Sequence, residues 1–165
     1  MRYGEAAPFS GNSAQPPHLR VYPTAQVLGT IPSWDWHRAR VDSARYSAIY
    51  RFTQRADALE RLGATGRIAH LAAALDDIPG VGPWSVAEPL QSFCGHPDAV
   101  SVGDYHLAHI VGFAFTGERT DDAGMLRLLA PYAGHRQRVV RLIQEVGIRK
   151  PRYGARISIP DYRDF

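Results

Sequence analysis

The feature that most constrains the fold is the stretch LDDIPGVGPWS, which lies between two apolar helical patterns at residues 75–85. Its two glycines are one residue apart, and a proline stands on each side of them. Glycine adopts backbone angles that other residues resist, and it leaves no side chain in front of a turn. The sequence therefore predicts two helices joined by a minimal hairpin at residues 79–82.

The predicted hairpin also suggests a binding site for an anion. The backbone N–H groups of Gly80, Val81 and Gly82 and of the following helix start, at Ser85, would be exposed, and the helix dipole would favour negative charge there. A DNA phosphodiester is the ligand that this arrangement suits. The alternative is that the tetrapeptide PGVG only connects two helices.

Apolar residues recur at helical spacing along almost the whole chain, and no segment alternates convincingly as a strand does. Polar caps and glycines divide this pattern into separate helices. We therefore expect an all-α fold, a helical bundle over residues 22–147, with an irregular arm at 1–21 and a basic tail at 148–165. The predicted helices begin at Thr24, at Asp42 (ending at Gly63), at Thr65, at Pro83 or Trp84 (running toward Cys94 and Gly95), at Asp104, at Asp121 or Asp122, and near His135 (running to Val146).

Length and composition limit the class of protein. A chain of 165 residues, 45% of them apolar, is long enough for one domain with a core. Its single cysteine, Cys94, excludes a disulfide framework, a four-cysteine iron–sulfur cluster and a cysteine-built zinc site within this chain. No apolar run has membrane-spanning length, and the N-terminus lacks the apolar core of a signal peptide, so we expect a cytoplasmic protein with no membrane partner.

The charge is unevenly distributed. The formal net charge is +3, and arginines concentrate after His135. A basic C-terminal third suits a polyanion partner, and a solvated arginine-rich face is an equal alternative on charge alone.

Three segments occur in a fixed order: LDDIPGVGPWSVAE, then DAVSVGDYHLAHIV, then MLRLLAPYAGHRQRVVRLI. With these segments the chain resembles the helix-hairpin-helix DNA glycosylase superfamily, and most closely its 3-methyladenine DNA glycosylase II group. The resemblance implies a partial glycosylase domain over residues 22–147 that contains a helix-hairpin-helix motif. It also implies a hydrolase of base excision repair that acts on damaged nucleoid DNA and releases N-alkylated purines, such as 3-methyladenine, from the duplex.

The resemblance assigns roles to single residues. Asp104 matches the catalytic carboxylate, which stabilises an oxocarbenium-like sugar or orients the attacking water; a plain helix N-cap is the alternative. Trp84 and Tyr105 match the lining of the base pocket, with a core tryptophan and a surface tyrosine as alternatives. Trp84 also stands where bifunctional relatives carry a lysine, so we expect simple base release that leaves an abasic site.

Basic residues and ions complete the predicted site. Arg136 matches an arginine that would orient the pocket or the DNA, and Arg138 is either a second basic contact or part of a solvated helix face. Family hairpins can hold a monovalent cation through backbone carbonyls, and no other cofactor is expected. His106 and His109 lack a third ligand, so they are interpreted as packing or phosphate contacts and not as metal ligands.

The chain departs from the family pattern in three ways. Family members carry further helices ahead of the matched region, so the resemblance implies that the remaining helices expose apolar faces. Such faces favour poor stability, aggregation or pairing with a separately encoded N-terminal half. Pro89 lies inside a predicted helix, where proline costs roughly 3 kcal/mol, and Glu88 puts a carboxylate where related enzymes often have an aromatic or small residue. Two hypotheses follow: a monofunctional glycosylase, or a truncated, inactive fragment that binds DNA without sequence preference.

Overall fold

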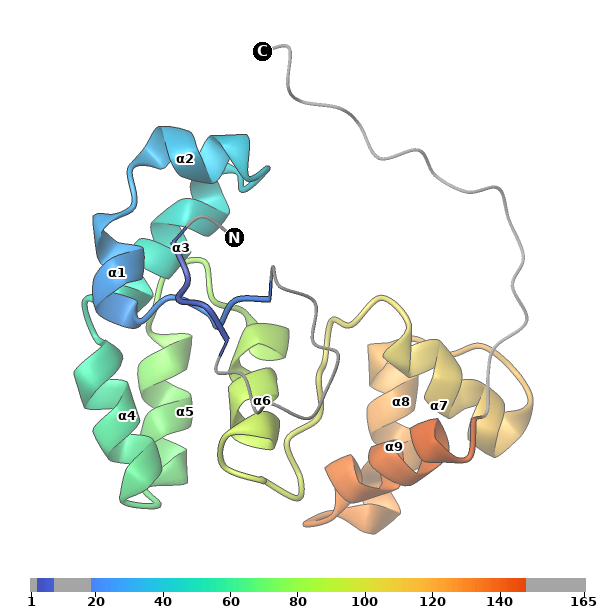
Figure 1. Ribbon diagram of the computed structural model, residues 1–165. Coiled ribbons are helices and arrows are strands. Elements are labelled where there is room, and N and C mark those ends of the chain that lie inside the picture. Colours follow the sequence, from blue (N-terminus) through green and yellow to red (C-terminus); the bar gives the residue numbers. More distant parts are fainter. Residues whose placement is uncertain (1–2, 8–18, 148–165) are drawn as a thin grey trace, which may run out of the picture. The chain divides into compact units, whose positions relative to one another are not determined.

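In the computed structural model, which describes residues 3–7 and 19–147, helices make up the regular structure (Figure 1). The all-α fold predicted from the sequence is confirmed. An isolated antiparallel bridge joins Ala6 to Arg20 in the segment predicted to be irregular, and the predicted basic tail at 148–165 lies outside the described residues. The helices are α1 (Ala25–Thr30), α2 (Ser33–Arg38), α3 (Ser43–Thr53), α4 (Ala56–Ala64), α5 (Ile68–Asp76), α6 (Pro83–Ser92), α7 (Leu107–Thr116), α8 (Asp122–Leu129), the 3₁₀ turn η1 (Ala130–Tyr132) and α9 (Arg136–Glu145).

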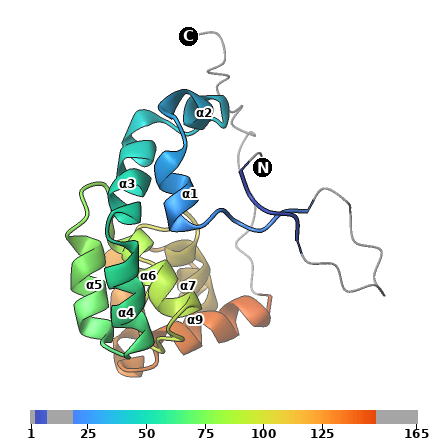
Figure 2. The same ribbon diagram turned by 60° about the vertical axis from the view of Figure 1, so that its left-hand side comes forward.

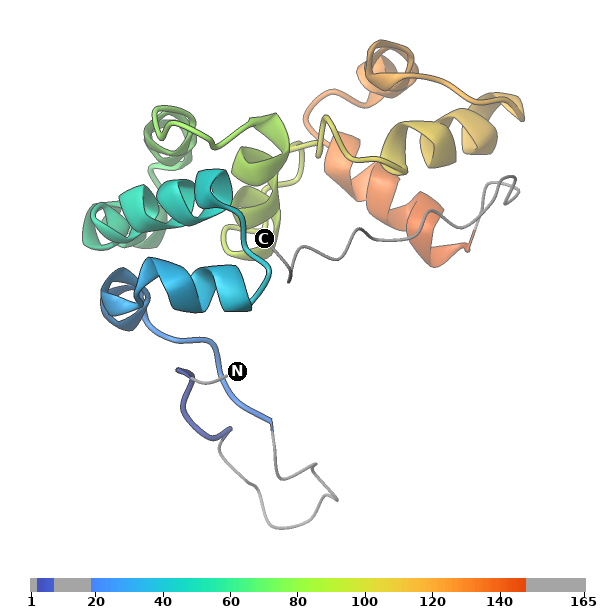
Figure 3. The same ribbon diagram turned by 90° about the horizontal axis from the view of Figure 1, so that it is seen from above.

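The chain divides into two compact units between Ala58 and Leu59, and residues 22–147 contribute to both. In the first unit α1 and α2 pack against α3 (Figure 3). These three helices contain no fully buried residue. Aromatic rings join α2 to α3 instead, with ring centroids 6.0 Å apart for Trp36 and Tyr46 and 6.2 Å apart for Tyr46 and Tyr50.

The second unit contains two hydrophobic clusters, the first of which involves α4, α5, α6 and the turn between α5 and α6 (Figure 2). Leu71 and Leu75 are one helical turn apart, so they share the buried face of α5. Ile78 belongs to the turn itself and is only 1% exposed. The hairpin is therefore anchored in the core. The buried members of this cluster are Leu59, Leu71, Leu75, Ile78 and Leu90.

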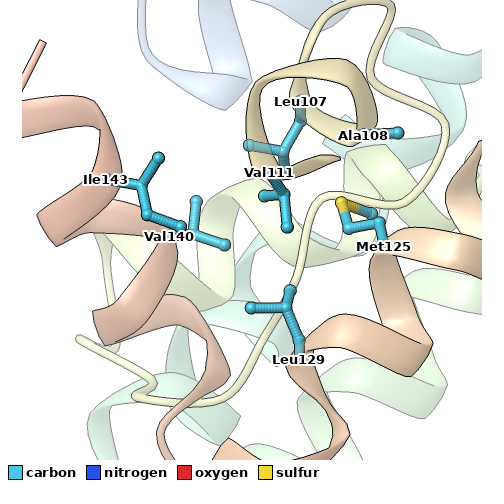
Figure 4. Packing of buried hydrophobic residues seen from close by; sticks show 7 residues of the cluster. All are labelled: Leu107, Ala108, Val111, Met125, Leu129, Val140 and Ile143. Atoms are coloured by element: carbon cyan, nitrogen blue, oxygen red, sulfur yellow. The ribbon is translucent and has the colours of Figure 1, made fainter. Parts of the chain in front are cut away.

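The second cluster is built by α7, α8 and α9, whose side chains point toward one another in Figure 4. Val111 of α7 and Met125 and Leu129 of α8 are 0% exposed. This core holds the first turn of α7 in place, directly after the predicted catalytic aspartate. Its buried residues are Leu107, Ala108, Val111, Met125, Leu129, Val140 and Ile143.

The single helix predicted for residues 42–63 is wrong, because the chain forms α3 and α4 there with a break at residues 54–55. The Thr53 hydroxyl donates to the Tyr50 carbonyl at 2.7 Å, and the Arg55 N–H donates to the Phe52 carbonyl, three residues back, at 3.0 Å. These local bonds replace the four-residue ladder and end the helix.

Other helix boundaries also differ from the prediction. Thr65 does not cap α5, because its hydroxyl donates to the Arg61 carbonyl of α4 at 2.7 Å. Helix α2 was not predicted; it begins directly after Pro32, where only the end of the preceding helix was expected. Helix α6 contains Pro89, as predicted, and ends at Ser92, before the predicted end near Cys94.

Candidate functional site

The turn that joins α5 to α6 contains a β-turn over residues 78–81. The Val81 N–H donates to the Ile78 carbonyl at 2.9 Å, and Gly80 has a φ of +94°. Pro79 at the second position and a positive-φ glycine at the third are the signature of a type II turn. Ile78 and Val81 pack in the core formed with α5 and α6, whereas Pro79 and Gly80 are exposed. The tip of the hairpin therefore presents mainly backbone.

Helix α6 begins directly after this turn, and no side chain caps its N-terminus. Gly82 is the N-cap and provides no side-chain hydrogen bond to the first turn, while Pro83 has no N–H to satisfy. A Cβ added at Gly82 would meet nothing within 4 Å. The N–H groups of the first turn, including that of Ser85, have no capping side chain, and this geometry suits an oxyanion.

The turn also has features that suit a monovalent cation. The carbonyls of Ile78 and Gly82 accept the N–H groups of Val81 and Val86, and a carbonyl oxygen retains a second lone pair for a further partner. The exposed Asp76 lies at the end of α5, just before the turn. These oxygens are the groups in the turn that could hold such a cation.

Asp104 lies two residues before His106, the N-cap residue of α7. Its Oδ1 atom accepts the His106 N–H at 2.7 Å and the Leu107 N–H at 2.8 Å, and its own N–H donates to the Ser101 carbonyl at 3.3 Å. Asp104 Oδ1 therefore caps the start of α7 from two residues ahead of the N-cap, and the helix predicted to begin at Asp104 begins at Leu107. Neither bond uses Oδ2, and the side chain is half-buried, so capping leaves one carboxylate oxygen for a further role.

Trp84 and Tyr105 are surface residues. Trp84 is 45% exposed in the first turn of α6, and Tyr105 is 78% exposed ahead of α7. This exposure does not fit a core role for Trp84. The Tyr105 ring makes an edge contact with the ring of His106, with centroids 4.7 Å apart. His109 has its Nδ1 atom 2.8 Å from the Thr120 carbonyl, which agrees with a packing role.

The segment before Asp104 is tied to α6 by a partly buried polar network that was not predicted. Ser101, 5% exposed, donates its hydroxyl to Glu88 Oε1 at 2.6 Å and accepts Gln91 Nε2 at 2.7 Å. Gln91 Nε2 also donates to the Ala99 carbonyl at 2.9 Å, and Gln91 Oε1 accepts Gln137 Nε2 of α9 at 2.7 Å. In the sequence, the position of Ser101 between two valines was the one indication that this serine is buried. Nothing in the sequence indicated that Gln137 contacts Gln91, which lies 46 residues away.

A second unpredicted residue, Asp98, joins the same segment to α9. Its Oδ1 accepts the Arg136 backbone N–H at 2.9 Å and the Arg136 Nε at 2.8 Å, while its Oδ2 pairs with a second guanidinium nitrogen. Hydrogen bonding to the Arg136 side chain holds the pKa of Asp98 far below its ordinary value, and the same bonds raise the pKa of Arg136. Arg136 is thus engaged within the protein. Arg138 is exposed, with a guanidinium nitrogen 3.0 Å from His135 Nδ1.

A pocket of about 440 Å³ lies beside these two sets of contacts. Asp104, Trp84 and Tyr105 are not among its lining residues. The residues predicted to line the base pocket therefore do not line this one. Its lining residues are Glu88, Gln91, Ser92, Gly95, His96, Pro97, Gln137, Arg138 and Arg141.

Within the described part of the chain, no helix is both long and apolar enough to cross a membrane. Over those same residues, no three His, Cys, Asp or Glu side chains gather in a way that could hold a metal ion. No protein-family model matches the chain, and no curated protein matches it significantly.

Proposed function

We propose that this chain binds duplex DNA through the α5–α6 turn and hydrolytically releases N-alkylated purines, as a monofunctional glycosylase of the helix-hairpin-helix type. The observation that carries the proposal is the direct attachment of the Asp104 segment to α6. Helix α6 begins at the turn, and its Glu88 and Gln91 side chains hold Ser101, which lies just before Asp104. A phosphate at the turn and a deoxyribose at Asp104 would thus be positioned by one continuous framework.

The turn would bind the DNA backbone, and the exposed aromatic side chains would bind the flipped base. Backbone N–H groups at Gly80, Gly82 and Ser85 would contact phosphate oxygens, which position the duplex without reading its sequence. The exposed rings of Trp84 and Tyr105 would stack on a flipped base, and a cationic ring binds an aromatic face favourably. Selection would then depend on the charge and shape of the flipped base.

The chemistry requires little beyond a fixed carboxylate. A purine alkylated on a ring nitrogen is already cationic, so it leaves as a neutral base with the electron pair of the glycosidic bond. Positive charge develops on the sugar carbon, where the Asp104 carboxylate would stabilise it. Water then adds to that carbon, and its released proton passes to Asp104 or to bulk water. The product is an abasic site in an uncut strand, because the tryptophan at position 84 offers no amine nucleophile.

Two capping aspartates give a matched test of the proposal. Asp104 caps α7, and Asp121 caps α8 by accepting the Gly124 N–H at 2.7 Å. Asparagine caps helices about as well as aspartate, so Asp104→Asn and Asp121→Asn should both fold. We expect release of methylated purines from alkylated duplex DNA by the wild type and by Asp121→Asn, and none by Asp104→Asn. Equal release by both variants would contradict a catalytic Asp104.

The second candidate function is DNA binding without catalysis, by the same turn. It is favoured by the capping bonds of Asp104, which by themselves account for an aspartate at this position. A wild-type chain that binds duplex DNA with salt-dependent affinity, yet releases no base, would establish it. Either function would place the protein on nucleoid DNA in the cytoplasm.

A further inference from the structure

The hydrogen bonds around Ser101 have directions that are determined by chemistry. A backbone carbonyl only accepts, so Gln91 must direct its amide nitrogen to the Ala99 carbonyl. The same nitrogen donates to Ser101 Oγ, which leaves the Ser101 proton for the Glu88 carboxylate. The Gln91 oxygen accepts from Gln137, so every polar atom of the Gln91 side chain is used. These bonds restrain Ser101, Gln91 and Glu88, since rotating one of these side chains breaks the bonds of the next. The network is incomplete at α9, where Gln137 Oε1 is buried without a hydrogen-bond partner among the described residues.

Only two residues separate Ser101 from Asp104, so the restraint on Ser101 also limits the position of Asp104. The Asp104 N–H returns to the Ser101 carbonyl, closing a tight turn. Gly103, inside that turn, has a φ of +89°, and its N–H donates to Asp122 Oδ2 at 3.1 Å. The turn is therefore held from α6 through the Ser101 side chain and from α8 through Asp122. Both attachments therefore restrain the backbone that leads to Asp104.

We propose that Ser101, Glu88 and Gln91 are positioning residues that hold the Asp104 carboxylate in the geometry needed for base release. The proposal rests on the proposed glycosylase function and extends it to the helix that follows the hairpin. Glu88 acts in it as a hydrogen-bond acceptor. This role differs from direct attraction of a cationic base by the Glu88 charge, and the two roles can be separated by mutation.

Four variants of the full chain separate these roles. Ser101→Ala removes the hydroxyl, and Gln91→Glu replaces the amide donors with a carboxylate that cannot donate to the Ala99 carbonyl. Glu88→Gln is the conservative variant, because its amide oxygen still accepts the Ser101 proton while the charge is lost. Ser92→Ala is the matched control, since the Ser92 hydroxyl donates only within α6, to the Glu88 carbonyl at 2.8 Å.

The kinetic readout is the split between kcat and KM for alkylated duplex DNA. We expect kcat to fall about tenfold in Ser101→Ala and in Gln91→Glu, a factor that corresponds to one lost hydrogen bond. KM should not change, because the α5–α6 turn is untouched. Glu88→Gln and Ser92→Ala should keep kcat within about twofold of the wild type. A loss in Glu88→Gln as large as that in Ser101→Ala would overturn the acceptor role.

Amide hydrogen exchange gives a readout that does not depend on activity. The His106 and Leu107 amides donate to Asp104 Oδ1, so a loosened Asp104 lets them exchange faster, by about tenfold in the two network-breaking variants. Unchanged exchange in both would overturn the positioning role, even in an active enzyme. Faster exchange in a chain whose wild type releases no base would refute the glycosylase function and still support the positioning of Asp104.

Discussion

Replacing Asp98 with alanine removes the carboxylate that joins α9 to the segment ahead of Asp104. This carboxylate accepts three hydrogen bonds from Arg136, one from the backbone and two from the guanidinium. The side chains of Asp98 and Arg136 are 17% and 34% exposed. The pair therefore lies between an exposed ion pair, worth about 0–1 kcal/mol, and a buried one, whose disruption costs about 3–5 kcal/mol. We expect the free energy of unfolding to fall by about 2–3 kcal/mol.

The effect of this substitution depends on pH in a direction set by the Asp98 pKa. Hydrogen bonding to Arg136 lowers the pKa of Asp98 in the folded protein. A lowered folded-state pKa stabilises the fold at pH values above the unfolded-state pKa, about 3.9. The stabilisation is lost as the pH falls from there through the folded-state pKa. The difference between the wild type and Asp98→Ala is therefore largest at neutral pH and shrinks below about pH 4.

Urea denaturation at pH 7 and at pH 3 measures both effects. Glu145→Gln is the control, because the Arg141–Glu145 pair on the same helix is 3.9 Å apart with side chains 72% and 71% exposed. We expect that control to change the free energy of unfolding by less than about 0.5 kcal/mol. A loss below about 1 kcal/mol at pH 7 in Asp98→Ala, or the same loss at both pH values, would refute the reasoning.

Three further predictions concern the hairpin and the core. Gly80→Ala should lower the free energy of unfolding by about 1–2 kcal/mol, because its φ of +94° strains any residue with a Cβ. Gly82→Ala should fold normally, since its Cβ meets nothing within 4 Å, and should weaken DNA binding in a filter or polarisation assay, because the methyl group stands in front of the turn. Leu129→Ala should cost about 2–5 kcal/mol in urea denaturation, because Leu129 is 0% exposed. Leu142→Ala, at a position that is 65% exposed, should change it by less than about 0.5 kcal/mol.

The helix starts that could be predicted are those encoded by one side chain and its near neighbours. Thr24 and Asp42 were predicted as caps, and Asp121 as one of two candidates. Each accepts the N–H of the residue three positions on, at 3.3, 2.8 and 2.7 Å. A cap needs only a short polar side chain at a helix start, so it is visible in the sequence. The break after Thr53 could not be predicted from the spacing of apolar residues, because that spacing continues from α3 into α4.

The sequence by itself determined the all-α fold, the tight turn at Gly80 and the capping aspartate at position 104, because each depends on contacts within a few residues. Only the tertiary structure decided that Ser101 is buried against α6 and that Asp98 pairs with Arg136, 38 residues away. These partners meet because the segment from α6 to α7 lies against α6 and α9, and that path depends on how the two hydrophobic clusters pack. Side-chain hydrogen bonds over such separations leave no periodic pattern in a single sequence, since either partner alone resembles an ordinary surface residue.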